Sequence, residues 1–430
     1  MPRARSSSFA EARAALSTAL HDPWLLANLV LRLALAVFVL SRPERWIGGD
    51  SHDYLMYARR ALHGEWGGHM SRPPLYTWFL SALAPGLTEP ETAAQVALPL
   101  VAQTLLVWLG GVALRARASR KVAIAWAYEP ALLVYSNVIM SDALCATVTL
   151  FTGLFAWQVL GEQARTLPGR SKAFFFGMAL GLVTLARSVA MIMGGFSALV
   201  LAWCWRGRRG ALVSLALLVL GAGVVLAPRV YWNGTAYGRW TVATQGDNWM
   251  GEVAGIVENE GSGLDSIHAQ KKWFAEHYGF RPIDPYKTLL AHWPTWAWLS
   301  AKGVARVLVG HVNVEWAHLL TGVVPLGPAW FKAPEARAGT QVSGAGLVAW
   351  VLGWLATLAF CVWVYASALR AAWKAGGLDQ YSVWLAACAA VLVGIPQVQG
   401  DARFRCAAWP LILLFWGWNE RRARIRVRGR

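Results

Sequence analysis

The sequence predicts an all-α integral membrane protein with about ten or more transmembrane helices, and three observations support this. Hydrophobic residues make up 56% of the 430 residues, and the mean hydropathy is positive. A water-soluble protein of this size could not bury that much apolar surface in a core. The apolar residues fall into long runs with few charges, and the basic residues gather between the runs. Helices that cross a bilayer have both properties, because they satisfy their own backbone polar groups in lipid.

The apolar runs are each close to the length needed to cross the hydrocarbon core of a bilayer. They cover residues 24–41, 94–114, 122–140, 143–160, 173–187, 191–205, 211–230, 346–369, 381–398 and 406–418. The runs at 191–205 and 406–418 are short for a full bilayer crossing, so the helices there are expected to begin or end several residues away from these boundaries. Inside the first and third runs, Arg32 and Glu129 are costly in hydrocarbon and are expected to face the bundle interior or each other.

Five short basic segments predict the orientation of the chain. They cover residues 115–121, 165–172, 206–209, 370–374 and the tail 420–430, and each follows an even-numbered run. Arginine-rich short loops stay in the cytoplasm, so both termini are expected there. The same rule explains the net charge of +17 without nucleic acid, which is therefore excluded as a partner.

Two segments are left on the outer side, and they divide the chain into three parts. We expect an N-terminal transmembrane module (1–230) with a catalytic first outer loop (42–93), a large outer segment (231–343), and C-terminal helices with a basic tail (344–430). From Asp53 onward the first loop can wind as an amphipathic surface helix that ends near Gly64. Residues 294–320 are too polar for a comfortable span and are expected on the membrane surface, which leaves the helix count of 231–343 open.

The first outer loop carries "GDSHDYLMYARRALHGEW" and then "RPPLYTWFLSAL". Further motifs follow in order: "VYSNVIMSDAL" (134–144), "GLVTLARSVAM" (181–191), "APRVYWNGTAYGRWTVATQGDNWMGE" (227–252) and "DARFRCAAWP" (401–410). Together they resemble the GT-C class of integral-membrane glycosyltransferases. Within this class, they look most like bacterial relatives of the protein O-mannosyltransferases and of the aminoarabinose transferase that modifies lipid A. The resemblance implies a sugar carried on polyprenyl phosphate as donor, with undecaprenyl phosphate as the bacterial carrier.

Asp50 is the carboxylate closest to the mouth of the bundle. It suits a general base that takes the acceptor proton in a single inverting displacement. On local sequence alone it is equally explained as a loop charge or helix N-cap. The resemblance places Asp142 at a second acidic position, where the family usually has Glu. Asp53 joins these two as a catalytic candidate, although it also suits a cap of the surface helix.

Guanidinium groups at the outer ends of the spans suit a phosphate that leaves as the sugar is transferred. Arginines at such positions can also simply reach toward lipid headgroups. The family often has Arg-Asn where this chain has Trp232 and Asn233, and an arginine one turn earlier is expected to replace it. The predicted donor-phosphate ligands are therefore Arg187, Arg403, Arg405 and Arg229.

The remaining candidates concern the substrate and a metal. Arg72, Tyr54, Tyr76 and Trp249 are predicted to contact the substrate, while an interfacial aromatic belt explains such aromatic residues as well. His52 stands beside Asp50 and Asp53 and suggests a metal site. Asp53 and Asp142 are alternatively able to share a divalent cation or hold the acceptor. No cofactor is required by the predicted chemistry.

The sequence thus predicts a glycosyltransferase of the bacterial inner membrane whose active site faces the periplasm or cell exterior. Its partners are a polyprenyl-phosphate-linked sugar, an acceptor that is lipid, polysaccharide or protein, and membrane lipids. Two alternatives stay open: a transporter of lipid-linked sugars, which would also need charges within the membrane, and a catalytically inactive relative. The sugar, the acceptor and the oligomeric state are not encoded in any motif.

Overall fold

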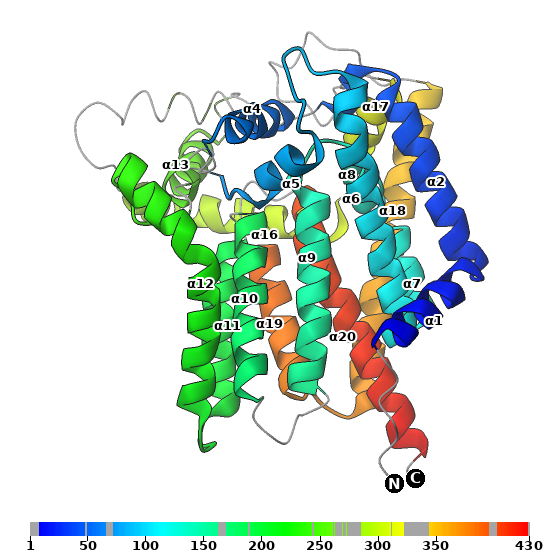
Figure 1. Ribbon diagram of the computed structural model, residues 1–430, viewed down its shortest axis with the longest axis vertical. Coiled ribbons are helices and arrows are strands. Elements are labelled where there is room, and N and C mark those ends of the chain that lie inside the picture. Colours follow the sequence, from blue (N-terminus) through cyan, green and yellow to red (C-terminus); the bar gives the residue numbers. More distant parts are fainter. Residues whose placement is uncertain are drawn as a thin grey trace.

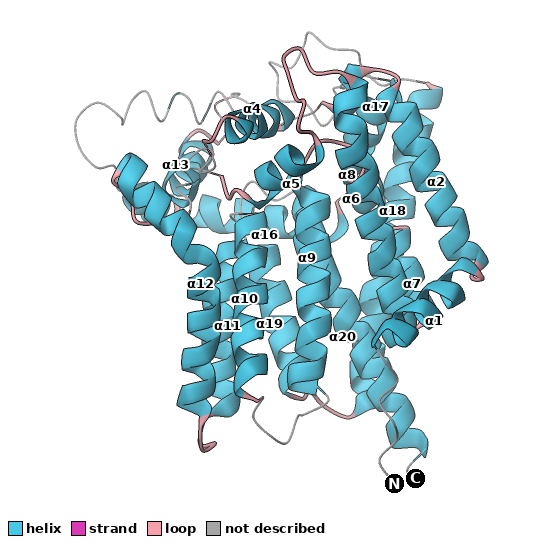
Figure 2. Cartoon of the chain, viewed as in Figure 1, coloured by secondary structure: helices cyan, strands magenta, loops and turns pink. Residues whose placement is uncertain are grey.

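A computed structural model of the chain describes residues 8–47, 50–65, 72–161, 169–187, 190–242, 245–260, 262, 269, 272, 285–310, 312–321, 344–394 and 402–428. Every regular element formed by these residues is a helix (Figure 2). The all-α prediction is confirmed for this part of the chain. Upright helices form a bundle, and shorter helices lie across one end of it (Figure 1).

The bundle consists of apolar helices of different lengths that share one large core of buried side chains. They are α2 (Pro23–Leu40), α6 (Ala93–Arg117), α7 (Arg120–Ala127), α8 (Pro130–Tyr135), α9 (Ser141–Ala156), α10 (Arg170–Ala186), α11 (Met191–Trp205), α12 (Ala211–Tyr237), α18 (Ala345–Ala375), α19 (Gln380–Gly394) and α20 (Ala402–Arg428). A π-helical turn, η1 (Trp157–Gly161), extends α9. Helix α20 packs against α9, α18 and α19, so the C-terminal helix lies inside the bundle.

The shorter helices pack around the ends of the bundle. They are α1 (Ser8–Leu20), α3 (Pro43–Trp46), α4 (Ser51–Leu62), α5 (Leu75–Leu83), α13 (Gln245–Glu258), α15 (Pro285–Ala291), α16 (Trp293–Val309) and α17 (Asn313–Thr321). Helix α1 lies near the end of the bundle that is lower in Figure 1, and α4, α5 and α13 lie at the upper end. Helix α16 runs across the bundle and contacts α18, α19 and α20.

Five helices are long and apolar enough to cross a membrane: α2, α6, α9 with η1, α12 and α18. Two more apolar helices, Met193–Trp205 and Gln380–Gly394, are shorter. All ten predicted runs begin in helices, but the other runs fall short in length or apolar character. The prediction of transmembrane helices is therefore confirmed for five helices, and the count of ten stays a prediction.

The third predicted span, 122–140, is wrong as a single helix. The structure divides it into α7 and α8, with a break at Tyr128 and Glu129. Proline lacks a backbone N–H and clashes with the preceding turn, so it favours the first position of a helix, and Pro130 is the first residue of α8. Glu129 caps α8, because its side chain accepts a hydrogen bond from the backbone N–H of Leu132 at 2.6 Å.

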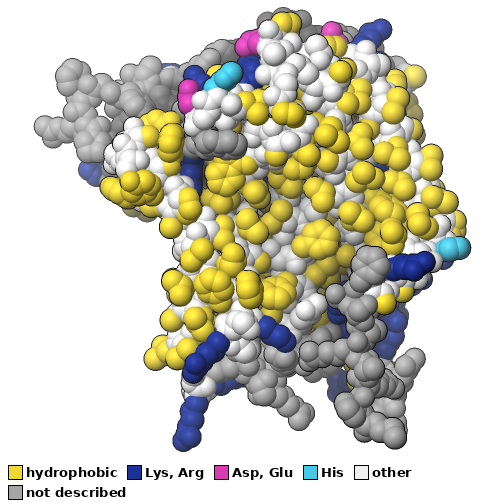
Figure 3. Space-filling view, in the orientation of Figure 1, with side chains coloured by type: hydrophobic (Ala, Val, Ile, Leu, Met, Phe, Trp, Pro, Cys, Tyr) yellow, Lys and Arg dark blue, Asp and Glu magenta, His cyan; other side chains and the backbone are white. Residues whose placement is uncertain are grey.

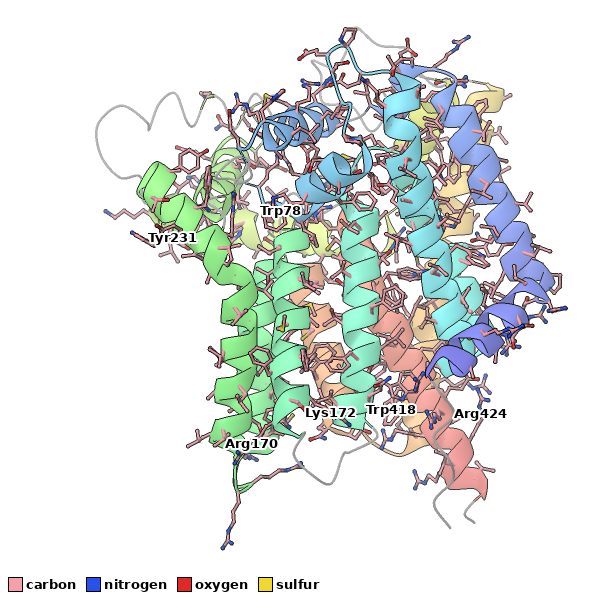
Figure 4. All side chains as sticks on the ribbon, in the orientation of Figure 1. Trp78, Arg170, Lys172, Tyr231, Trp418 and Arg424 are labelled. Carbon is pink, nitrogen blue, oxygen red and sulfur yellow. The ribbon has the colours of Figure 1, made fainter. Side chains whose placement is uncertain are left out.

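Charge is distributed unevenly along the bundle axis. On the face shown in Figure 3, apolar side chains cover the middle, and lysine and arginine gather at the lower end. Arg170, Lys172 and Arg424 lie at this end in Figure 4, whereas Trp78 of α5 and Tyr231 of α12 lie toward the other. This separation is the arrangement that the positive-inside rule produces in a membrane protein.

Helices α10 and α12 approach each other so closely that only glycine fits between them. A Cβ atom at Gly177 would clash with the carbonyl oxygen of Leu218, and one at Gly221 with that of Phe174. Small residues at such positions let two backbones pack directly in a membrane bundle. This contact fixes α10, whose last residue, Ala186, directly precedes the predicted site residue Arg187.

We expect Gly221→Ala to lower the free energy of unfolding by about 1–3 kcal/mol, because the added methyl group overpacks the α10–α12 contact. Gly223→Ala in the same helix is the matched control, since a Cβ there meets no atom within 4 Å. The control is expected to be neutral or to stabilise the helix by up to about 1 kcal/mol. Thermal unfolding of the detergent-solubilised protein measures both, and equal effects of the two variants would contradict the packing argument.

Candidate active site

Helix α4 places Asp50 at one end of the bundle. The predicted amphipathic pattern is confirmed: Tyr54, Leu55, Ala58 and Ala61 are buried beneath the helix. Asp50 is the residue that precedes the first turn of α4, but its side chain makes no capping hydrogen bond. The simple capping explanation of Asp50 therefore does not apply, and its carboxylate has other partners.

Hydrogen bonds to the chain around the start of α9 hold α4 in place. The hydroxyl of Ser51 donates to the carbonyl of Ile139 at 2.8 Å, and the Tyr54 and Ser141 hydroxyls are hydrogen-bonded at 2.8 Å. The backbone N–H of Ile139 in turn donates to the carbonyl of Trp46, 3.0 Å away. These bonds fix the start of α4 relative to the start of α9, and hence Asp50 relative to Asp142.

Arg72 joins the two carboxylates of the first loop. Its Nη2 lies 3.0 Å from Oδ1 of Asp50 and 2.8 Å from Oδ2 of Asp53. Its guanidinium also lies 5.3 Å from the centre of the Tyr54 ring, a cation–π distance. Arg72 was predicted to contact the substrate, and the structure places it between the first two acidic candidates.

Asp142 at the start of α9 brings in two more arginines. It forms an ion pair with Arg187, and Nε of Arg403 lies 4.0 Å from its Oδ1. Nη1 of Arg403 also lies 3.5 Å from Oδ2 of Asp50, so Arg403 connects both carboxylates. We refer to these residues as the carboxylate–arginine cluster: Asp50, Asp53, Arg72, Asp142, Arg187 and Arg403.

The members of the cluster differ in their access to solvent. The side chains of Asp50 and Asp53 are 30% and 46% exposed, whereas that of Asp142 is 1% exposed. Asp50 and Asp53 are therefore open to solvent, whereas Asp142 is enclosed and contacts Arg187 and Arg403. The three carboxylates share a predicted catalytic role, but their exposure to solvent differs.

The arginines control the ionisation of Asp50. Burial alone would raise the pKa of this carboxyl group, but the hydrogen bond from Arg72 and the charges of Arg72, Arg403 and Arg187 outweigh burial and lower the pKa. The paired carboxylates also raise the pKa of Arg72. Asp50 is thus a carboxylate at neutral pH, the form that can accept a proton.

Arg229 adds a further positive charge beside the cluster. It is buried in α12, and its Nη2 donates to the carbonyl of Arg72 at 2.9 Å. Its Nε donates to the carbonyl of Val242 at 3.1 Å. Four guanidinium groups and three carboxylates therefore lie together among these residues.

Arg405 has a different place from the one predicted. It is fully buried, and both its Nε and its Nη2 lie 2.9 Å from Oε1 of Glu129. Its Nη1 donates to the carbonyl of Gly310 at 2.8 Å. Arg405 is thus committed to a structural ion pair and is not retained as a donor-phosphate ligand. Arg32 and Glu129 both face the bundle interior, as the first of the two predicted alternatives has it, but they are not hydrogen-bonded to each other, since Arg32 donates to Asn28, Ser136 and backbone carbonyls.

Tyr54 and Tyr76 form the wall beneath the cluster. Their rings meet edge to face at 4.9 Å, and both side chains are buried. The Tyr76 hydroxyl donates to Gln103, whose amide nitrogen donates to the carbonyls of Ser136 and Val138 at 2.9 and 2.8 Å. Sequence reasoning missed Gln103, although an uncharged polar residue within an apolar run is a usable signal.

One predicted residue does not join the cluster, and the side chain of another is not among those described. His52 is exposed, and among the described residues no group of three or more His, Cys, Asp and Glu side chains is arranged to hold a metal ion. Trp249 belongs to α13, but its side chain lies outside the described residues. Neither residue enters the proposals made below.

Comparison with known proteins finds similarity only at the level of structure. No family model matches the chain, and no curated protein matches it. A structure of the oligosaccharyltransferase AglB from Archaeoglobus fulgidus, in complex with an inhibitory peptide and a dolichol-phosphate, has a TM-score of 0.45 and 14% identity. The match covers 93% of this chain and 50% of AglB, so the chain spans about half the length of that protein.

The second similar protein is ArnT from Cupriavidus metallidurans, bound to undecaprenyl phosphate. Its TM-score is 0.40 at 15% identity, and the match covers 94% of this chain and 78% of ArnT. AglB and ArnT are both GT-C glycosyltransferases, the class that the sequence motifs resemble. The similarity concerns the fold, and the chemistry of this chain has to be argued from its own side chains.

Proposed function

We propose that the protein is a membrane glycosyltransferase that moves a sugar from a polyprenyl-phosphate carrier to an acceptor hydroxyl. The observation that carries this proposal is the placement of Asp50: an accessible carboxylate held between Arg72 and Arg403, with Arg187 and Arg229 close behind. A base and a set of guanidinium groups at one end of an apolar bundle are what this transfer requires. The same end is opposite the basic segments, so we propose that the site faces the periplasm or cell exterior.

The reaction is a single inverting displacement. The acceptor oxygen attacks the anomeric carbon of the donor, and the bond from this carbon to the phosphate oxygen breaks as the new bond forms. The acceptor proton passes to a carboxylate oxygen of Asp50, and the electron pair of the broken bond leaves with the phosphate. Asp50 is suited to this step because it is ionised and 30% exposed.

The arginines receive the leaving phosphate. Arg403 lies beside both Asp50 and Asp142, so its guanidinium is close to the base and can contact the phosphate as it leaves. Arg187 approaches the same oxygen of Asp142, Oδ1. Planar guanidinium groups bind phosphate oxygens in pairs and stabilise the charge that develops on them. Buried Asp142 keeps these two arginines oriented before the donor arrives.

A transfer assay tests this function. The purified protein is incubated with a radiolabelled polyprenyl-phosphate sugar and candidate acceptors, and product is followed together with release of polyprenyl phosphate. Covalent transfer of label supports the proposal. A transporter of lipid-linked sugars would instead move intact donor across a proteoliposome membrane with no bond broken, and that result would overturn the enzyme assignment.

Arg72→Gln is expected to move the acid limb of the pH–rate profile to higher pH. Arg72 lowers the pKa of Asp50, so the base stays ionised below the ordinary aspartate value of about 3.9 in the wild-type protein. Without Arg72, burial raises the pKa again, and the base is protonated at a higher pH. Values of kcat/KM, determined from initial rates across the acid pH range, measure the shift.

Arg59→Gln is the control for this experiment. Arg59 lies on the same helix as Asp53 but pairs with Glu89 and Glu91, away from Asp50. Its removal is expected to leave the acid limb in place. An unchanged limb in the Arg72 variant would show that Asp50 is not the group whose protonation stops the reaction.

A further inference from the structure

A polar cavity of about 530 Å³ opens at the far end of α6 from the carboxylate–arginine cluster. Its walls come from the end of α1, the start of α2, the end of α6 and the start of α7. It is lined by two arginines, Arg115 and Arg120, together with Asp22, His21, Ser17 and Thr18. The proposed transfer reaction makes no use of this cavity.

Asp22 holds the two arginines in position. Its side chain is 4% exposed and accepts a hydrogen bond from the backbone N–H of Trp24 at 3.1 Å. Nε of Arg120 lies 2.9 Å from its Oδ2, and Nε of Arg115 lies 3.4 Å from the same oxygen. Burial would raise the pKa of Asp22, but the two arginines and the Trp24 N–H lower it overall, so the anchor is charged.

The anchoring leaves hydrogen-bond donors unused. Arg115 contacts Asp22 only through Nε, and Arg120 contacts it through Nε and Nη2. Neither Nη atom of Arg115, nor Nη1 of Arg120, has a partner among the residues that the structure describes. Two guanidinium groups against one carboxylate leave one positive charge at the cavity. Oriented guanidinium forks with a surplus charge match the oxygens of a phosphate group.

Apolar side chains beside the cavity favour a lipid over a soluble molecule as the source of that phosphate. Leu16, Leu20 and Trp24 adjoin the lining residues in sequence and are 40%, 44% and 54% exposed. Trp24 lies in the first turn of α2, one of the five helices that are able to cross a membrane, which puts the cavity at the level of lipid headgroups. A soluble phosphate would gain nothing from these side chains, whereas the acyl chains of a lipid would cover them.

We propose that this cavity binds the phosphate headgroup of an anionic phospholipid of the surrounding bilayer. The phosphate lies against Arg115 and Arg120, and the acyl chains extend along Leu16, Leu20 and Trp24. Basic pockets between membrane helices recognise lipid headgroups in this way. The inference is independent of the proposed transferase activity, because it concerns the opposite end of the molecule.

The test is a titration of the full-length protein in detergent with phosphatidylglycerol, read by native mass spectrometry. The variant Arg115→Gln with Arg120→Gln is expected to bind about thirtyfold more weakly than the wild type, from about fivefold lost with each arginine near the headgroup. The charge-matched control is Arg117→Gln with Lys121→Gln. Both control residues are exposed near the cavity but do not line it, so affinity is expected to be unchanged.

Additional binding measurements distinguish this proposal from its alternatives. Equal losses in both double variants would show general attraction to a basic surface and overturn the proposal. Glycerol phosphate that binds as tightly as phosphatidylglycerol would overturn the lipid assignment, as would equal binding of phosphatidylcholine. If the glutamine variant does not fold, Arg115→Lys with Arg120→Lys keeps the charge but loses the forks. This variant has to bind phosphatidylglycerol more weakly than the wild type, and equal binding would also refute the proposal.

Discussion

Asp50→Asn is expected to lower the rate of sugar transfer by about 10²–10⁴-fold, the usual contribution of a general base. The substitution keeps the size of the side chain and removes both the charge and the proton acceptor. Arg403, Arg187 and Arg229 remain, so binding of the labelled donor is expected to persist. Parallel measurement of kcat and donor affinity checks this. A variant that keeps full activity would eliminate Asp50 as the base.

Asp53→Asn is the matched control for that experiment. Asp53 is three residues away on the same helix, binds the same nitrogen of Arg72 and is more exposed than Asp50. It has no ion pair with Arg403 among the described contacts, so we assign it to positioning Arg72. A loss of less than about tenfold is expected, in line with the small energies of exposed ion pairs. Equal losses for Asp50 and Asp53 would contradict the assignment of Asp50 alone.

The bundle was largely predictable because it depends on local patterns. Each apolar run begins in a helix, and the surface helix after Asp50 buries the predicted side of the helix. The error at 122–140 was also local, since Pro130 is a sequence signal for a helix boundary. Helix ends were less predictable: α12 continues seven residues past the predicted 230 and carries Asn233, which binds the Val242 carbonyl.

The site was predictable only in part, because its contacts join residues distant in sequence. The topology placed Asp50, Asp142, Arg187 and Arg403 at one end of the bundle, and the structure brings them into one cluster. Which carboxylate is buried and which is exposed depends on packing between helices, so no local pattern reveals it. The bridge from Arg72 to Asp50 and Asp53 joins a residue before α5 to the start of α4, and no periodic pattern in the sequence predicts it.

Arg403 and Arg405 show both the reach and the limit of sequence reasoning. Residues two apart on a helix point in nearly opposite directions, so only one of the two arginines can face Asp50. Helical geometry alone therefore excludes their joint assignment to phosphate. The choice between them depends on Glu129, 276 positions away along the chain, which takes Arg405.

Arg405→Ala is expected to lower the free energy of unfolding by about 3–5 kcal/mol, because it leaves the carboxylate of Glu129 buried and unpaired. The matched control is Arg422→Ala on the same helix, whose ion pair with Asp379 has side chains 25% and 20% exposed. An exposed pair of this kind contributes about 1 kcal/mol or less. Thermal unfolding in detergent compares the two variants.

Replacing both partners, Arg405→Met with Glu129→Leu, is expected to recover much of the loss, because no charge is then left unpaired. If Arg405→Ala cost no more than Arg422→Ala, the pair would not anchor the start of α20, and the orientation of Arg403 toward Asp50 would need another cause.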